Sequence, residues 1–435
     1  MESDKSILSV IMCKVLNNKT IAKNTGYLTI IECVRLFLPF VALPYIIRTI
    51  GAERYGMVAF AQTIVQYFII IINFGLDISA VKDVAVHRDD QELLSKIVST
   101  VLSIKSLLFL FAATLFLVGI LIIPFMREYP VLMLFAFMTC LSELLFPVWF
   151  FQGMENMRYI TIVRSSSILF YTITVFMFIH EQSDFELVAL LQSLGNVLAG
   201  VIAFYCLLRI EKIRLSIPSA GMFRQMFKEA IPFWFSRISV TFNTNLAKTV
   251  SGLFLSMESV AAFDVAQKIA NAVLIPTRML NQATYPHVAR SQDRRFATRF
   301  VGFVALIATF LSLLTCLLAP LLIRVFAGDS IPESVNILRV LCVFTLTTSV
   351  VISMGSCMLV PFGYPMPFNK SVVLSTFVLC AIYGLIYLLD IHTSVSFAAA
   401  LVLSDVFVLS YRAYYCIKYK LLTFSNKKSV KYYGG

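Results

Sequence analysis

The chain has 435 residues, of which 59% are hydrophobic and only 14% are charged. Water-soluble proteins have about a quarter of their residues charged, so this composition excludes a soluble globular protein. The formal net charge is +12, but membrane topology explains the basic surplus better than nucleic-acid binding does, and no nucleic acid is expected. The 9 cysteines are scattered without a CxxC pair, which favours apolar packing over a metal site or disulfides.

Apolar runs recur from one end of the chain to the other, and many approach the roughly 20 residues that a helix needs to cross a bilayer. They are continuous and do not alternate in polarity, which predicts transmembrane helices and not barrel strands. We therefore expect an all-α membrane protein with about twelve spans. The predicted spans are 27–47, 57–77, 98–123, 130–151, 159–180, 185–208, 230–255, 259–286, 300–325, 334–360, 370–390 and 395–417.

Polar and charged residues interrupt the spans of the first half. The first span contains Glu32 and Arg35, the fourth contains Glu143 and the fifth contains Arg164. In the second span the polar residues are spaced by four, seven and four positions, so they share one helical face. They are Gln62, Gln66, Asn73 and Asp77.

The spans of the second half contain longer polar stripes. The tenth span contains Arg339. The seventh has one polar face formed by Arg237, Thr241, Thr244, Asn245 and Lys248. The eighth has one formed by Asp264, Gln267, Lys268, Asn271, Arg278 and Gln282.

Charged groups within hydrocarbon cost at least about 2.5 kcal/mol each on insertion scales, so each is a functional candidate. One interpretation is that they pair with each other, since Glu32 with Arg35 and Asp264 with Lys268 have helical spacing. The other is that they line a hydrated cavity, because buried pairs rarely repay their desolvation cost. The intramembrane charged groups are Arg35, Lys105, Arg164, Arg237, Lys248, Lys268, Arg278 and Arg339 against Glu32, Asp77, Glu143, Asp264 and Asp405.

This excess of basic groups predicts a cationic cavity and an anionic cargo, because Arg and Lys bind phosphate well. The predicted substrate-binding residues are Arg35, Arg164, Arg237, Lys248, Lys268, Arg278 and Arg339. The residues predicted to couple transport to an ion, or to pair with the bases, are Glu32, Asp77, Glu143 and Asp264. The predicted polar lining is Gln62, Gln66, Asn73, Asn245, Gln267 and Asn271.

Loop charges predict the topology. Alternate loops contain roughly 24 Lys and Arg residues against about four in the others, which places both termini in the cytoplasm and requires an even number of spans. A shift of 205 residues carries Gln62 onto Gln267 and matches the second span to the eighth, as expected for two six-helix halves. We predict an N-terminal lobe at 1–208, a cytoplasmic linker at 209–229 and a C-terminal lobe at 230–435.

Four motifs carry a resemblance to a known family. They are PFVALPYIIR at 39–48 with the following Gly51 and Tyr55-Gly56, Phe74-Gly75-Leu76, Arg88-Asp89-Asp90, and PVWFFQGMENMRY at 147–159. With them the chain resembles bacterial O-antigen/polysaccharide flippases of the Wzx type, in the multidrug/oligosaccharidyl-lipid/polysaccharide exporter superfamily.

The resemblance implies twelve helices in two six-helix lobes around a central cationic cavity. It implies an undecaprenyl-pyrophosphate-linked oligosaccharide, the O-antigen repeat unit, flipped by alternating access from the cytoplasmic to the periplasmic leaflet of the bacterial inner membrane. It also implies coupling to an H⁺ or Na⁺ gradient with no other cofactor. The implied partners are membrane lipids, an O-antigen polymerase and a chain-length regulator.

Alternative functions remain open at this point. Another exporter of the superfamily, for capsule or for drugs, has the same layout, although cationic drugs favour an anionic pocket. A membrane polymerase or glycosyltransferase is disfavoured, because the predicted non-cytoplasmic loops are short and no DxD, HExxH or P-loop motif occurs. Within the longest motif, the ring of Trp149 suits either sugar stacking or an interfacial aromatic belt.

Overall fold

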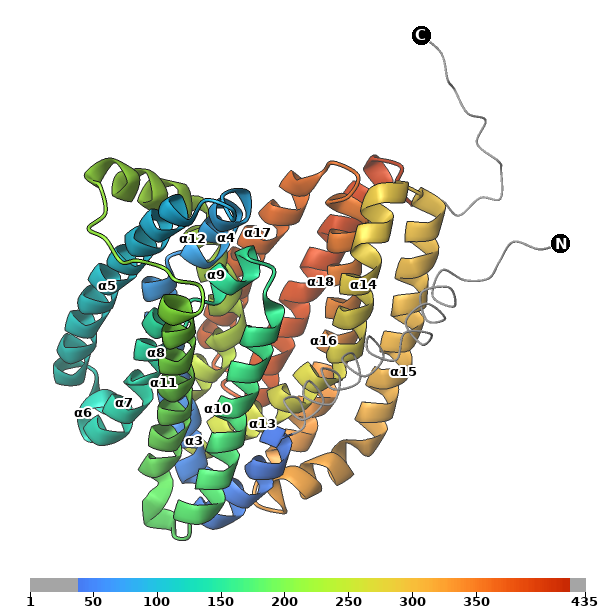
Figure 1. The fold of residues 1–435 in the computed structure, drawn as a ribbon. Coiled ribbons are helices and arrows are strands. Elements are labelled where there is room, and N and C mark those ends of the chain that lie inside the picture. The colour runs from blue at the N-terminus through green and yellow to red at the C-terminus, as the bar shows by residue number, and fades with distance from the viewer. Residues whose placement is uncertain (1–37, 423–435) are drawn as a thin grey trace, which may run out of the picture. The chain divides into compact units, whose positions relative to one another are not determined.

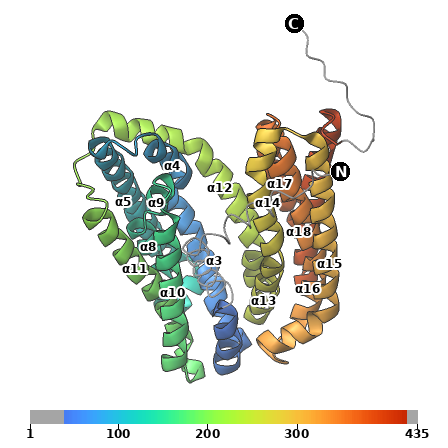
Figure 2. The ribbon, with the colours of Figure 1, turned by 45° about the vertical axis from the view of Figure 1, so that its right-hand side comes forward.

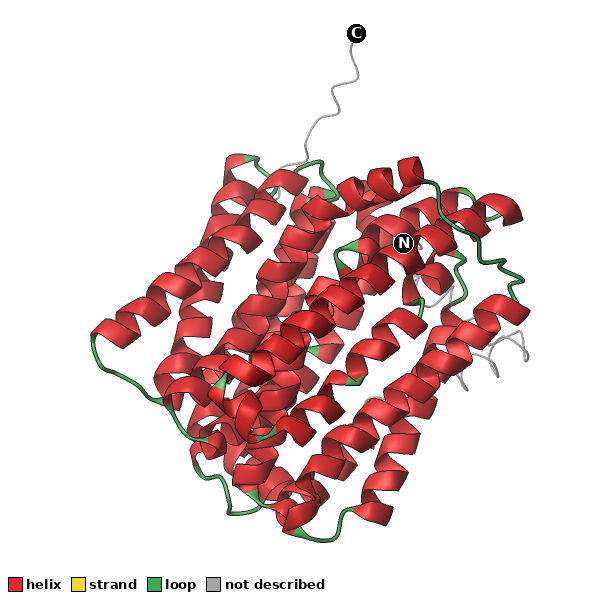
Figure 3. Ribbon diagram, turned by 90° about the vertical axis from the view of Figure 1, so that its left-hand side faces the viewer, coloured by secondary structure: helices red, strands yellow, loops and turns green. Residues whose placement is uncertain are grey.

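The structure, a computed structural model, describes residues 38–422. Every regular element in that range is helical (Figure 1, Figure 3). Nine helices of the described range are long and apolar enough to cross a membrane, so the chain is an all-α, multi-pass membrane protein, as predicted. The count of twelve spans and the central cationic cavity stay predictions.

The nine membrane-length helices lie over nine of the predicted spans. Of the remaining three, 27–47 is described only from residue 38, within the shorter apolar helix Leu38–Ile50. The other two, 230–255 and 259–286, are helical but fall outside the nine. These two segments contain the longest polar stripes, which lower their hydropathy.

The helices up to residue 209 are Leu38–Ile50, α3 (Ala52–Asn73), α4 (Leu76–Val86), α5 (Gln91–Ile122), α6 (Pro124–Glu128), α7 (Pro130–Phe137), α8 (Thr139–Leu145), α9 (Val148–Gly153), α10 (Met157–Phe178), the 3-10 turn η1 (Gln182–Asp184) and α11 (Phe185–Arg209). The later ones are α12 (Ala220–Phe254), α13 (Met257–Val273), α14 (Ile275–Ser291), α15 (Arg294–Ala327), α16 (Glu333–Met354), the π-helix η2 (Gly355–Leu359), α17 (Pro365–Leu388) and α18 (Ser394–Lys418).

The described chain divides into two compact units. Unit 1 contains residues 38–51 and Ile64–Phe235, and unit 2 contains Ala52–Thr63 and residues 236–422. Helices α3 and α12 each contribute residues to both units, whereas α4 to α11 belong to unit 1 and α13 to α18 to unit 2 (Figure 2). The lobe boundaries predicted at 208 and 230 stay predictions.

Helix boundaries support the internal repeat. The shift of 205 residues carries the first residue of α3, Ala52, onto the first residue of α13, Met257. It also carries the last residues of α4 and α5 onto the last residues of α14 and α15. The shift matches these three helix ends, but not the helix lengths, since α3 has 22 residues and α13 has 17.

The core of unit 1 explains two of the sequence motifs. Phe74 and Gly75 both have positive φ, 45° and 74°, and end α3 before α4 begins. A Cβ on Gly75 would lie 2.7 Å from the Ala230 carbonyl oxygen of α12, so only glycine permits this close approach. The Phe74 ring stacks on Trp234 of the same helix, with ring centroids 4.8 Å apart.

The aromatic motif at 147–159 also belongs to this core. Trp149, Phe150 and Phe151 are buried and pack against α4 and α5. The predicted roles of Trp149 in sugar stacking or in an interfacial belt are therefore wrong, because its ring is only 1% exposed. The motif's Glu155 instead contacts Arg88 of the other loop motif, at 3.5 Å.

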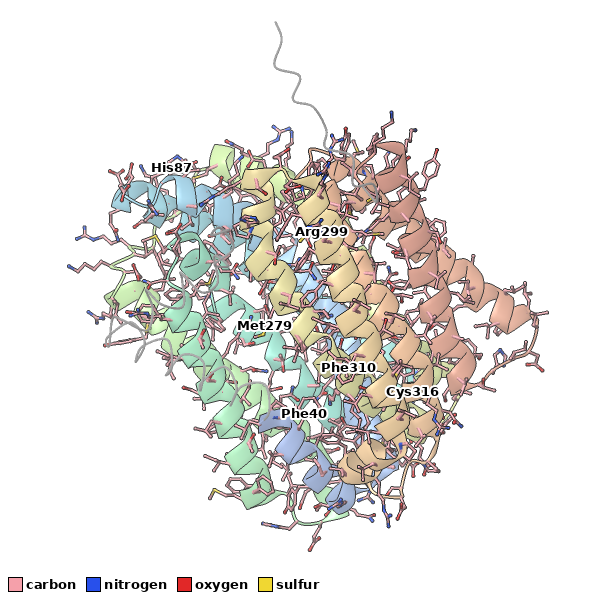
Figure 4. The ribbon with its side chains drawn as sticks, turned by 90° about the vertical axis from the view of Figure 1, so that its right-hand side faces the viewer. Phe40, His87, Met279, Arg299, Phe310 and Cys316 are labelled. Atoms are coloured by element: carbon pink, nitrogen blue, oxygen red, sulfur yellow. The ribbon has the colours of Figure 1, made fainter. Side chains whose placement is uncertain are left out.

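Helix α15 of unit 2 has an exposed apolar face. Leu306, Phe310 and Leu317 are at least two-thirds exposed. Figure 4 shows Arg299 near the N-terminal end of α15, followed along the helix by Phe310 and Cys316. An apolar face of this length with a basic end is what a bilayer requires of a spanning helix.

Candidate functional site

A buried lysine joins three helices of unit 1. Lys105 on α5 is 2% exposed and donates from Nζ to Asn73 Oδ1 of α3 at 2.7 Å. It also donates to the main-chain oxygen of Glu143 on α8, at 3.1 Å. That carbonyl has no helical donor, because the residue four positions later is Pro147, which has no N–H. We call these residues, with Asp77, the Lys105 cluster.

Two carboxylates balance this lysine. Asn73 Nδ2 donates to Glu143 Oε2 at 3.0 Å, so the amide bridges the ammonium group and the carboxylate. Asp77, at the start of α4, interacts electrostatically with Lys105. With these groups ionised, the cluster has one positive and two negative charges.

Unit 2 contains a cluster of the opposite sign, the Asp264 cluster. Asp264 on α13 is 5% exposed and lies between two lysines: Lys248 of α12 at 3.2 Å and Lys268 of α13 at 2.7 Å. The Tyr55 hydroxyl of α3 donates to Asp264 Oδ2 at 2.6 Å and accepts from Lys268 Nζ at 2.6 Å. One carboxylate therefore serves two ammonium groups, and the net charge is positive.

Close backbone packing brings Tyr55 to this cluster. A Cβ on Gly56 would lie 1.8 Å from the Met257 carbonyl oxygen, so glycine allows the start of α3 to lie directly against the start of α13. The Lys268 ammonium group also lies 5.2 Å from the centroid of the Tyr55 ring. In the Tyr55-Gly56 motif, Gly56 therefore allows the close packing and Tyr55 makes the hydrogen bonds.

The helical spacing of Asp264 and Lys268 predicts a salt bridge, and the structure contains it. The companion pair of Glu32 and Arg35 lies outside the described residues. Several residues of the predicted polar lining bond to nearby backbone instead: Gln267 Nε2 donates to the Thr244 carbonyl, and Asn245 Nδ2 donates to the Thr241 carbonyl, both at 3.0 Å. The Asn245 bond stays within α12, whereas the Gln267 bond joins α13 to α12.

The remaining predicted basic residues are not in either cluster. Arg237 on α12, Arg278 on α14 and Arg339 on α16 are exposed in unit 2, as is Asn271 on α13. In unit 1 Arg164 and Gln66 are exposed, and the Arg164 guanidinium lies 5.9 Å from the centroid of the Phe146 ring. Gln62 is half-buried in unit 2. These exposed side chains are not engaged in either cluster.

Arg412 and Asp405 form a third polar site, in unit 2. Arg412 on α18 is 3% exposed and donates to the Val351 carbonyl at 2.6 Å and to Ser371 Oγ at 3.0 Å. Asp405 lies about two turns earlier on α18 and accepts a hydrogen bond from the Thr348 hydroxyl at 2.9 Å. Gly355 at the start of the π-helix leaves room for the Arg412 guanidinium.

Sequence analysis placed Lys105 among the intramembrane charges but did not select it as a site residue, and it did not select Tyr55 at all. The signal for Lys105 was a charge inside a helix long and apolar enough to cross a membrane. Tyr55 had no such signal, because a tyrosine near a span end is ordinary. Its role depends on a contact 209 residues away along the chain.

Comparison with known proteins gives a family match over most of the chain. Residues 21–292 match the family described as "Polysaccharide biosynthesis protein". A relative from Escherichia coli K12, named "Putative O-antigen transporter", is 23% identical over 82% of this chain and 88% of its own length. A protein of the same name from Shigella dysenteriae is 24% identical over 84% of this chain and 91% of its own length.

Solved structures give the fold. The inward-facing conformation of a multidrug resistance MATE family transporter of the MOP superfamily superposes with a TM-score of 0.71 at 15% identity, over 90% of this chain and 96% of that one. The lipid II flippase MurJ in its inward closed conformation gives a TM-score of 0.69 at 13% identity, over 91% of this chain and 90% of that one. The fold of this chain is therefore similar to the folds of these two proteins.

Proposed function

Because this chain belongs to the polysaccharide biosynthesis protein family, we propose that it is a flippase that moves a lipid-linked oligosaccharide across a bilayer without altering it chemically. We propose an undecaprenyl-pyrophosphate-linked O-antigen repeat unit as the substrate, carried from the cytoplasmic to the periplasmic leaflet of the bacterial inner membrane by alternating access. The names of the two bacterial relatives support the O-antigen part of this proposal.

The observation that carries the proposal is a set of exposed arginines on three helices of unit 2. Three arginine side chains are exposed on three different helices of this apolar chain. They are Arg237 on α12, Arg278 on α14 and Arg339 on α16. Guanidinium groups bind pyrophosphate oxygens in pairs, with charge-assisted hydrogen bonds. Asn271 adds an amide that hydrogen-bonds to sugar hydroxyls or phosphate equally well.

The two lysines of the Asp264 cluster have a different part in this proposal. Lys268 is 43% exposed at its side chain and Lys248 is 14% exposed, and both are bonded to Asp264. Their net positive charge attracts the pyrophosphate over a longer range, while the exposed arginines make direct contact. The predicted contacts of Arg35 lie outside the described residues, and Arg164 remains a proposed contact of unit 1.

We propose that the Lys105 cluster couples transport to H⁺ or Na⁺. Its two carboxylates, Asp77 and Glu143, both interact electrostatically with the one ammonium group of Lys105. A bound cation or proton would neutralise the remaining negative charge. The orientation with both termini in the cytoplasm, and the polymerase and chain-length regulator as partners, belong to the same proposal.

Deletion of the gene in its own host tests this function. We expect the mutant to accumulate lipid-linked single repeats in the inner leaflet and to lose surface polysaccharide, with both restored by a plasmid copy. Normal surface polysaccharide in the mutant would contradict the proposal.

A drug exporter is the competing function, since the chain also superposes on a MATE transporter. The same deletion strain separates the two. Under our proposal its susceptibility to cationic drugs stays at the parental level, whereas a drug exporter would make the deletion strain more susceptible while its polysaccharide stays normal.

A further inference from the structure

A pocket on the surface of unit 1 lies between α5 and the segment that joins α11 to α12. Its volume is about 410 Å³, and it is lined by Ser99, Leu102, Ser103, Ser106, Leu107, Leu110, Leu215 and Ser216. The joining segment passes along the first turns of α5 (Figure 1). The lining is therefore half leucine and half serine, on a helix that crosses the membrane.

Serines on α5 hold the joining segment in place. Ser95 and Ser99, one turn apart, accept hydrogen bonds from the main-chain N–H groups of Arg214 and Ser216, at 3.2 Å and 2.9 Å. Ile213 is buried in the core of unit 1 and anchors the same segment. Ser99 and Ser216, which form the second of these bonds, also line the pocket.

The serine stripe continues into the pocket with Ser103 and Ser106. The hydroxyls of Ser95, Ser99 and Thr114 on the same helix each donate to the carbonyl four residues earlier. Among the described residues, Ser103 and Ser106 have no hydrogen-bond partner for their hydroxyls. A hydroxyl without a partner is costly in hydrocarbon, so these two favour a ligand with acceptor atoms.

The flank of the pocket is basic, and its outer edge is apolar. Lys212 and Arg214 are exposed just before the lining residues Leu215 and Ser216. Ile217 is 97% exposed, which suits a side chain inserted into the edge of a bilayer. Basic residues at this level attract anionic lipid headgroups.

We propose that this pocket is a binding site for an anionic glycerophospholipid. Its phosphate contacts Lys212 and Arg214, its ester carbonyls accept hydrogen bonds from Ser103 and Ser106, and an acyl chain covers Leu107 and Leu110. A polyprenyl chain does not fit this pattern, since an isoprenoid has no acceptor atoms to meet two hydroxyls inside the pocket. The site is independent of which cargo the protein carries.

Lipid retention by the purified full-length protein tests the site. The probes are phosphatidylglycerol and phosphatidylethanolamine with identical acyl chains, added in detergent and quantified by native mass spectrometry. We expect preferential binding of phosphatidylglycerol. The double variant Ser103→Ala/Ser106→Ala should weaken it about tenfold, as expected for two lost hydrogen bonds.

Charge is tested separately. Arg214→Gln should weaken phosphatidylglycerol binding about fivefold, with phosphatidylethanolamine unchanged. The matched controls are Thr114→Val, which removes an exposed α5 hydroxyl that already has a partner, and Arg290→Gln, which removes an exposed arginine of unit 2. Both controls should bind phosphatidylglycerol as the wild type does.

Leu107→Trp provides a second route, because it fills the pocket and leaves both serines in place. It should reduce phosphatidylglycerol binding while the thermal unfolding midpoint without lipid stays unchanged. Equal binding of both phospholipids, or wild-type binding by the serine and tryptophan variants, would overturn the proposal. So would displacement of phosphatidylglycerol from this pocket by polyprenyl phosphate, which would make the occupant an isoprenoid.

Discussion

The Lys105 cluster of unit 1 and the Asp264 cluster of unit 2 both compensate a buried charge, and the buried charge has the opposite sign in the two units. In unit 1 one buried ammonium group faces two carboxylates and a bridging amide. In unit 2 one buried carboxylate faces two ammonium groups and a bridging phenol. The shift of 205 residues does not carry one cluster onto the other, since Lys105 falls on Phe310 and Tyr55 falls on Val260.

The difference matters because the two signs relax differently when a partner is removed. Removal of Asp264 leaves two ammonium groups close together without a carboxylate, whereas removal of Lys105 leaves Glu143 still hydrogen-bonded to the Asn73 amide. The Asp264 cluster should therefore be the less tolerant of substitution.

The largest effect is expected for Asp264→Asn. It leaves Lys248 and Lys268 close together without a carboxylate, and breaking a buried ion pair from one side costs about 3–5 kcal/mol. The thermal unfolding midpoint of the purified protein should fall sharply, while Glu258→Gln on the exposed face of the same helix leaves it unchanged.

A second substitution sharpens this result. Lys248→Met should restore more of the lost stability of Asp264→Asn than Lys268→Met does, because Lys248 is 14% exposed and Lys268 is 43% exposed. Equal recovery by the two methionines would show that burial does not distinguish the two lysines.

Lys105→Met should have the next largest effect, about 2–3 kcal/mol, because Asn73 and the Glu143 carbonyl both lose a donor. The loss should be smaller than for Asp264→Asn, since Glu143 keeps its hydrogen bond from the Asn73 amide. Thermal unfolding of Lys105→Met and of Lys105→Met/Glu143→Gln measures this. A double variant that is less stable than the single one would contradict a charge-based role for Glu143.

Tyr55→Phe should cost about 1.5–2 kcal/mol, the lower part of the range for a hydrogen bond to a charged group. It removes the bond to Asp264 and the acceptor for Lys268, but it keeps the ring. In the Asp264→Asn background the same substitution should cost clearly less. An equal cost in both backgrounds would mean that the hydroxyl does not act through the carboxylate.

The smallest effect on stability is expected for the exposed arginines. Arg237→Gln and Arg278→Gln should each change the free energy of unfolding by no more than about 0.5 kcal/mol, as surface substitutions do. Thermal unfolding of each variant checks this, and a large loss would mean that the guanidinium group holds the fold together.

These contrasts also show how far sequence reasoning reached. Apolar run length predicted the helical membrane fold, and the spacing of Asp264 and Lys268 predicted their salt bridge. The opposite signs of the clusters were not predictable, because Tyr55, Asp264 and Lys248 come from three helices and a count of charges does not pair them. The prediction for Trp149 was wrong for a related reason. Its side chain is buried in the core of unit 1, and a hydropathy profile does not show which end residues of a span pack into the core.

The central claim, that exposed basic side chains of unit 2 carry an anionic lipid-linked substrate, is tested most directly by transport in vivo. The double variant Arg237→Gln/Arg278→Gln is compared with Arg299→Gln, an exposed arginine at the start of α15 (Figure 4), in a strain that lacks the chromosomal gene. We predict that the double variant inserts normally but leaves lipid-linked repeats in the inner leaflet, while Arg299→Gln restores surface polysaccharide. Full restoration by the double variant would contradict the account.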